Sequence, residues 1–262
     1  MAHVIYDNFV LANEIEDQYN SYLNLARFCT VDNSLVGDPG MLVKIITYSA
    51  TDGTEKLAMG EGNSKIIDVS YTDDEYRILL AQNRFRYFDE QEMTDPVVVT
   101  TGLRHAAVDM FNHVNDDVFA EFNKATLVVD NAVAPNFEAF VDAAALLNVE
   151  NLEGLELFAF LNPKDVAKAR KAMKDELKYV EAFARTGYVG TIAGWNLYTK
   201  RNAVEGTIVG GTKEAVTVFN KRGVEIEQDR NPDIRENIIW SRKYYLAALT
   251  DASKAVKITL AT

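Results

Sequence analysis

The sequence DPVVVTTGLRHAAVDMFNHVNDDVFAEFNKAT, residues 95–126, predicts one long amphipathic helix. Its apolar residues recur at steps of three and four and therefore share one face: Leu103, Ala107, Met110, Val114, Val118, Phe122 and Ala125. Asp95 before Pro96, and later Thr100 or Thr101, are helix-start signals. Some 25 helical residues would span roughly 35 to 40 Å. A rod of this length with one apolar face suits an extended slab, although an ordinary surface helix of a globular enzyme would show the same periodicity.

The composition limits the class of protein. With 262 residues, the chain can form one large domain or two modest ones around a substantial core. Its formal net charge of -12 argues against tight nonspecific binding to nucleic acid, because no surplus of Lys and Arg is available to displace counterions from phosphates. The lone cysteine, Cys29, excludes an intrachain disulfide and a multi-cysteine zinc site, and we expect it to be a buried thiol.

The hydropathy pattern predicts no membrane segment. No run of about 18 apolar residues occurs. The first 17 residues, MAHVIYDNFVLANEIED, carry acids where a signal peptide would carry a basic and then an apolar region. We therefore expect the protein to be made in the cytoplasm of its cell and to have no membrane partner.

The chain before the long helix predicts an arm and a hairpin. Residues 1–28 alternate aromatics with acids and amides, with a short helix near residues 14–25, and resemble an arm that is ordered by packing on another surface. Between residues 41 and 88, the apolar-alternating runs LVKIITY and IIDVSYTDDEYRILLAQNRFRYF flank a polar, Gly-rich stretch, which predicts a long hairpin with a broad tip. Because a lone hairpin is marginal in water, it must lie against the same subunit or a neighbour.

After the long helix, helices and strands alternate. Strands are predicted at LVVD, residues 127–130, and LELFAFLN, residues 155–162, and helices at NFEAFVDAAALLN, residues 136–148, and after Pro163. From Tyr188 the chain is β-rich and ends in a strand pair, residues 237–251 and 255–262, with Ser253 and Lys254 at the turn between them. The fold class is therefore α+β.

The motifs that carry chemistry are absent or incomplete. In GTIVGGTK, residues 206–213, Thr212 precedes Lys213, so the order that a Walker loop requires is broken. GEG at residues 60–62 lacks the third glycine of a dinucleotide fingerprint. His3, His105 and His113 have no zinc-site spacing, and no G-x-S-x-G occurs. We expect no catalytic, cofactor-binding or metal-binding residues and no cofactor, and a chain of extended elements without a site fits a self-assembling building block.

The order of the segments then becomes specific. The extended-loop segment is KLAMGEGNSKIIDVSYTDDEYRI, residues 56–78, and FDEQEMTDP, residues 88–96, leads into the long helix. Two further segments follow: FEAFVDAAALLNVENLEGLELFAFLNPKDVAKARKAM, residues 137–173, and a β-rich region at residues 187–203, 206–228 and 236–258. In this order they resemble the major capsid protein of tailed bacteriophages, which has the Hong Kong 97-type coat fold.

The resemblance implies a domain plan. It places an N-terminal arm at residues 1–28, a connection at 29–40, the extended β-hairpin loop at 41–88 and a peripheral domain at 89–176 with its spine helix at about 96–125. An axial domain would follow at 177–230, and return strands at 231–262 would rejoin the peripheral domain. The subunits would form hexamers and pentamers that close into an icosahedral virion head around double-stranded DNA, with no sequence-specific contact to the DNA.

The resemblance also implies partners and contact residues. The chain goes straight into the arm without a fused scaffolding region, which implies a separate scaffolding protein or none, and the resemblance also implies a portal. Contacts between copies are expected from the extended loop and from salt-dependent pairs around the symmetry axes, each worth little alone: Lys56, Glu61, Lys65, Arg222, Asp229, Arg230 and Asp233. An encapsulin-like nanocompartment shell and a small cytoplasmic α+β enzyme acting through carboxylates are the alternatives.

Overall fold

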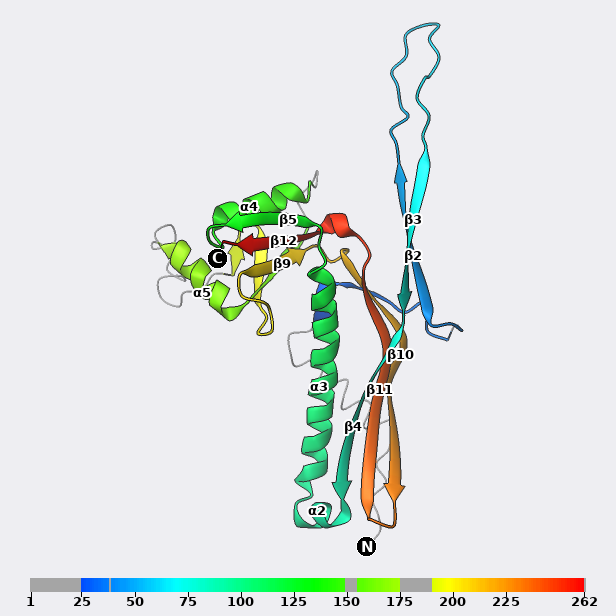
Figure 1. The fold of residues 1–262 in the computed structure, drawn as a ribbon, viewed down its shortest axis with the longest axis vertical. Helices are drawn as coiled ribbons and strands as arrows, with labels where there is room; N and C mark the ends of the chain where they lie inside the picture. Colours follow the sequence, from blue (N-terminus) through cyan, green and yellow to red (C-terminus); the bar gives the residue numbers. More distant parts are fainter. Residues whose placement is uncertain (1–24, 38, 149–154, 175–189, 262) are drawn as a thin grey trace.

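The computed structural model describes residues 25–37, 39–148, 155–174 and 190–261 (Figure 1). The predicted arm and the short helix near residues 14–25 therefore lie outside the described residues, except for the 3₁₀ turn η1 (Leu25–Phe28). The described chain forms a long slab, a compact unit at one end of the slab, and a hairpin that projects away from both (Figure 1).

The slab is built on the predicted helix, which is confirmed. Helix α3 (Val97–Phe122) spans 26 residues and follows the short helix α2 (Asp89–Thr94). Asp95 Oδ1 accepts a hydrogen bond from Val97 N at 3.0 Å, and Pro96 stands directly before the helix, as the start signal required. The predicted apolar face is buried along α3, from Val99 to Phe122.

A four-stranded sheet runs along α3. Its strand order is β1-β10-β11-β4: β1 (Thr30–Asp32), β10 (Val216–Asn231), β11 (Glu236–Leu249) and β4 (Leu79–Phe88). The face of α3 that carries Val99, Leu103 and Ala107 packs on Tyr87 and Ile239 of the sheet. The approach is close at Gly102, where an added Cβ would lie 2.2 Å from the Phe85 ring. The absence of a side chain at this position lets the helix lie against β4.

The compact unit is a six-stranded sheet covered by two helices. The order is β5-β12-β9-β6-β8-β7, formed by β5 (Leu127–Ala132), β12 (Ala255–Leu260), β9 (Thr207–Gly211), β6 (Leu157–Leu161), β8 (Trp195–Thr199) and β7 (Thr191–Ile192). Helices α4 (Phe137–Leu146) and α5 (Pro163–Ala172) begin where Asn136 and Asn162 cap them. Trp195 is buried in this core and its Nε1 donates to Phe140 O at 3.0 Å. The strands and helices predicted at residues 127–172 are confirmed.

An aromatic cluster joins the slab to the compact unit. Phe28 contacts Phe158 and Tyr198, with ring centroids 4.9 and 4.5 Å apart, and Phe122 from α3 meets Phe158 at 5.6 Å. A partly buried ion pair, Lys200 with Asp116 at 2.5 Å, adds a second connection between the two units. The long helix is therefore fixed to both parts of the molecule.

The predicted hairpin is shorter than expected. Strands β2 (Leu42–Ala50) and β3 (Val69–Arg77) form an antiparallel pair, but the run predicted as one strand divides at Ile78, and the part after it, β4, pairs with β11. Leu42 is the first residue of β2 and faces Arg77, so residues 79–88 have no partner within the hairpin. The preceding loop turns away at Gly37 and Gly40, whose φ angles are 91° and 115°.

The predicted final strand pair is wrong. β11 and β12 lie in different sheets, and residues 252–254 form the 3₁₀ turn η2 (Ala252–Lys254) between them. From Glu236 to Tyr245 both edges of β11 are occupied, by β10 and β4, so β12 has no free edge along most of this strand. β12 instead fills the place between β5 and β9.

The expected domain boundaries at 176/177 and 230/231 cut through the sheets. β6, placed in the expected peripheral domain, pairs with β8 and β9 from the expected axial domain. β10, also from the expected axial segment, belongs to the sheet that runs along α3. Strands distant in sequence pair with each other, so segments taken in chain order do not coincide with the units of the structure.

Cys29 is buried, as expected, and its thiol should be inert in the folded protein. Burial raises the pKa of Cys29 to about 12. Because the thiolate is the reacting species, we expect native protein at pH 8 to resist alkylation by iodoacetamide, whereas the denatured chain should be labelled fully. Mass spectrometry of both samples measures the labelled fraction, and rapid labelling of native protein at pH 8 would contradict this environment.

Candidate assembly surfaces

The tip of the β2–β3 hairpin is organised by its own hydrogen bonds. Glu55 accepts from Ser64 N and Ser64 Oγ, both at 2.9 Å, and Glu61 Oε2 accepts from Ala58 N at 3.1 Å. The hydrogen bonds from Ser64, first of all from its backbone, hold the pKa of Glu55 below its usual range. The tip therefore has a defined shape although it projects into solvent (Figure 1).

The tip brings together three of the expected contact residues. Lys56, Glu61 and Lys65 line one hollow of the tip and all three are exposed. Glu61 faces its own backbone, whereas no ion pair within the described residues engages Lys56 or Lys65. The two lysines thus give the outer end of the hairpin an available positive charge.

The other four expected residues lie on the long sheet, and the structure does not bring them together at the compact unit. Arg222 pairs with Glu225 at 3.0 Å near an irregularity of β10, while Asp229, Arg230 and Asp233 lie at the far end of the β10–β11 hairpin. All four are exposed. Arg230 is engaged within the chain, because its Nη2 donates to Asp89 Oδ2 at 2.7 Å.

Asp89 organises that far end, and sequence reasoning missed its role. Asn237 Nδ2 donates to Asp89 Oδ1 at 2.6 Å while Arg230 occupies the other oxygen, and Arg235 pairs with Glu90 at 2.9 Å. The carboxylate therefore connects the start of α2 to both strands of the β10–β11 hairpin. The only sequence signal was the acidic run FDEQEMTDP before the long helix, which does not identify distant partners.

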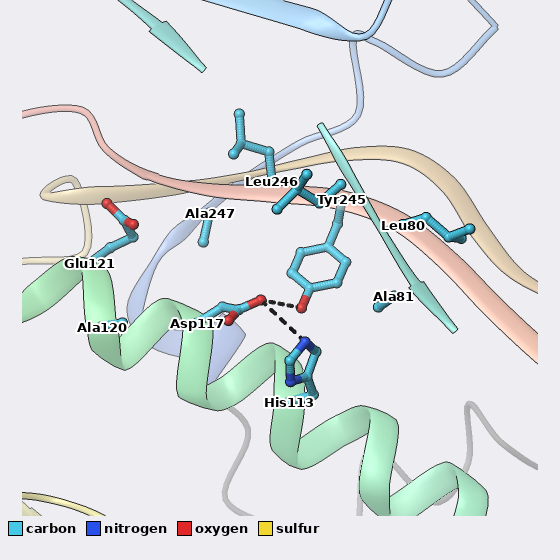
Figure 2. A pocket seen from close by; sticks show the side chains of 10 residues that line it. Leu80, Ala81, His113, Asp117, Ala120, Glu121, Tyr245, Leu246 and Ala247 are labelled. Carbon is cyan, nitrogen blue, oxygen red and sulfur yellow. Dashed lines mark hydrogen bonds and ion pairs between the residues drawn. The ribbon is translucent and has the colours of Figure 1, made fainter. Parts of the chain in front are cut away.

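A cavity of about 380 Å³ lies between α3, the start of β4 and β11 (Figure 2). Tyr245 OH donates to Asp117 Oδ2 at 2.5 Å, and His113 Nε2 lies 4.0 Å from the same oxygen. Leu79 and Leu80 line the cavity beside them. The Tyr245–Asp117 hydrogen bond connects helix to sheet, and no serine or cysteine among the described residues lines the cavity as a nucleophile.

The described part of the chain was compared with the needs of a metal site and of a membrane span. Among these residues, no cluster of three or more His, Cys, Asp or Glu side chains could hold a metal ion. None of the helices in the described ranges combines the length and apolar character needed to cross a membrane. Exposed apolar side chains occur on the hairpin, and Phe137 and Val141 present two more that lie four residues apart on α4. Such surfaces are typical of protein–protein contacts.

Comparison with known proteins gives a curated relative and several solved structures of similar fold. No family model matches the chain. It is 28% identical over 261 residues to the major capsid protein of Staphylococcus phage phiMR11, covering 95% of this chain and 92% of that protein.

Solved structures with the same fold include two particle shells. The capsid of a native GTA particle superimposes with a TM-score of 0.69 at 12% identity, covering 100% of this chain and 93% of the other. The virus-like particle from Pyrococcus furiosus has a TM-score of 0.65 at 15% identity, covering 97% and 100%. The helix, both sheets and the projecting hairpin thus belong to a fold that those proteins share over nearly their whole length.

Proposed function

We propose that this chain, a homologue of phage major capsid proteins that has the Hong Kong 97-type coat fold, forms the shell of a phage virion. The observation that carries the proposal is the sequence similarity to a phage major capsid protein over 95% of the chain. Copies of the chain would associate as hexamers and pentamers and close into an icosahedral head around double-stranded DNA. Its role would be structural, without catalysis.

Exposed hydrophobic surface supports a function in self-assembly. A projecting two-stranded hairpin is marginal in water, so it needs a partner surface to cover its apolar side chains. We propose that the hairpin lies across an adjacent subunit and that the compact six-stranded unit gathers around the five- and six-fold axes. Of the expected arm, residues 1–28, the last four pack in this chain's own core around Leu25 and Phe28, so we propose that only residues 1–24 run along a neighbour. Obligate interfaces of this kind bury more than about 2,000 Å².

The remaining partners follow from the same proposal. A separate scaffolding protein would guide closure, a portal would occupy one vertex, and assembly would take place in the host bacterial cytoplasm. The net charge of -12 is compatible with enclosed DNA that is not bound tightly, because a shell without surplus cations displaces few counterions from phosphates.

The direct test is electron microscopy of negatively stained protein purified alone, with sedimentation of the same sample. We expect closed, uniform shells or hexamer-sized rings, and large sedimenting particles. A protein that remains monomeric or dimeric, even when a scaffolding protein is supplied, would contradict the proposal. In that case the cavity beside Asp117 and His113 becomes the place to search for activity, with loss of turnover in Asp117→Asn as the measurement.

The virus-like particle from Pyrococcus furiosus has the same fold, so an encapsulin-like shell remains the second candidate. The contents of purified shells distinguish the two. Nuclease-resistant DNA inside particles made during phage growth supports the virion, whereas an enclosed protein cargo without DNA supports the nanocompartment.

A further inference from the structure

The two faces of the β2–β3 hairpin differ in chemistry. Side chains alternate between faces along each strand, and cross-strand partners share a face. Tyr48 lies opposite Tyr71, with ring centroids 6.4 Å apart. We call this the tyrosine face, and its apolar members are Leu42, Ile46, Tyr48, Val69 and Tyr71. The opposite, hydroxyl face carries Thr47, Ser49, Ser70 and Thr72 along its outer half.

We infer that the tyrosine face is the side of the hairpin that packs on a second copy of this chain, while the outer half of the hydroxyl face remains toward solvent. This rests on the proposed shell function and adds which side of the hairpin is buried there. The same-chain alternative fails on geometry, because β3 continues through Ile78 into β4 and the hairpin projects away from its own slab (Figure 1).

Within the described chain, the cover on the hairpin strands lies at the root of the hydroxyl face. At the root of that face Val43 is buried, and Ile45 and Tyr76 are half-buried. Burial also raises the pKa of Tyr76, and this side chain interacts electrostatically with Glu121 and Lys124 of the slab. By contrast, the five apolar side chains of the tyrosine face are 43–68% exposed. The surface that still requires cover is therefore the tyrosine face.

The exposed area is large enough for an interface. A fully exposed large side chain such as tyrosine has about 150 to 250 Å² of surface. With roughly half of each exposed, the five side chains together present apolar surface on the order of 500 Å². A patch of that size on a monomer is commonly functional. A standard interface buries about 800 Å² per partner, of which somewhat more than half is apolar. The tyrosine face can supply that apolar part.

The charges on the tyrosine face suit a second copy. Two copies of a chain with net charge -12 repel each other, so a contact between them needs locally balanced charge. The face provides this balance, because Lys44 pairs with Asp73 and lies opposite Glu75, while Arg77 supplies the second cation. These four side chains are the charged residues of the tyrosine face, and its other residues are aromatic or aliphatic.

The test compares neighbouring residues on opposite faces. Tyr48→Asp places a charge on the tyrosine face, and Thr47→Asp places the same charge one residue away on the hydroxyl face; both positions are exposed. Since loss of a central interface aromatic commonly lowers affinity by about tenfold or more, we expect Tyr48→Asp to raise the protein concentration needed for shells by at least about tenfold. Thr47→Asp should stay within about twofold of wild type. Sedimentation measures the assembled fraction.

A fluorescence measurement tests burial independently of assembly yield. Tyr48→Trp should shift its emission to shorter wavelength when shells form, whereas Thr47→Trp should not shift. The native Trp195 and Trp240 supply the same background in both variants. An unshifted emission from the Tyr48→Trp variant would overturn the inference, and so would equal assembly defects in both aspartate variants. In either case the proposed function would still stand, provided that the wild-type protein forms shells. Failure of the wild-type protein to form any shell would instead overturn the proposed function.

Discussion

Gly210→Ala is expected to lower the free energy of unfolding by about 3 kcal/mol, near the upper end of overpacking effects. Gly210 lies in β9, inside the six-stranded sheet, and an added Cβ would lie 2.2 Å from Phe158 O and 2.9 Å from Ala159 Cα of β6. Both are backbone atoms of a paired strand, so they cannot move aside without breaking the β6–β9 ladder. The reduced entropy of the unfolded alanine chain offsets only about 0.4 to 1 kcal/mol.

The measurement is thermal unfolding of the unassembled protein, followed by circular dichroism. A loss of about 3 kcal/mol should lower the midpoint by roughly 6 to 12 °C in a chain of this size. Gly223→Ala is the matched control, because no atom lies within 4 Å of the added Cβ. Its midpoint should remain near that of wild type, and a Gly210→Ala midpoint equal to the control would show that the sheet can open at this position.

Removing the hairpin tip should abolish closed shells without unfolding the subunit. In the variant, residues 51–68 are replaced by Asn-Gly, which closes the hairpin after the pair Ala50–Val69 with a two-residue turn. The hydrogen bonds seen for the tip residues join them to one another, as in Glu55 with Ser64 and Asn63 with Gly53. The slab and the compact unit therefore lose no contact that supports their cores, whereas a neighbouring subunit would lose the whole tip.

Sedimentation and negative-stain microscopy measure the outcome, with circular dichroism to establish folding. Gly62→Ala serves as the control, because it keeps the tip and its added Cβ meets no atom within 4 Å. We expect normal shells from the control and free subunits or open rings from the shortened hairpin. Closed shells of normal size from the shortened hairpin would mean that the tip makes no essential contact between copies.

The part of the fold that local sequence predicts is the part that depends on near neighbours. The periodicity from Leu103 to Phe122 predicted the long helix, because apolar residues three and four positions apart share one face of a helix whatever the rest of the chain does. Asn136 and Asn162 mark helix starts through contacts two or three residues ahead. The expected contact residues were harder to place from the sequence. Lys56, Glu61 and Lys65 share the hairpin tip, as local sequence suggested, whereas the four residues around β10 do not join the compact unit.

The α+β class, the long helix, the existence of a projecting hairpin and the resemblance to phage coat proteins all follow from the amino-acid sequence. Three features emerge only in the folded chain: the run before the helix divides at Ile78, β11 and β12 separate into two sheets, and Asp89 joins Arg230 and Asn237. The difference arises because helical periodicity and capping are local. Strand pairing instead depends on which edges distant segments leave free, and no local pattern encodes that competition.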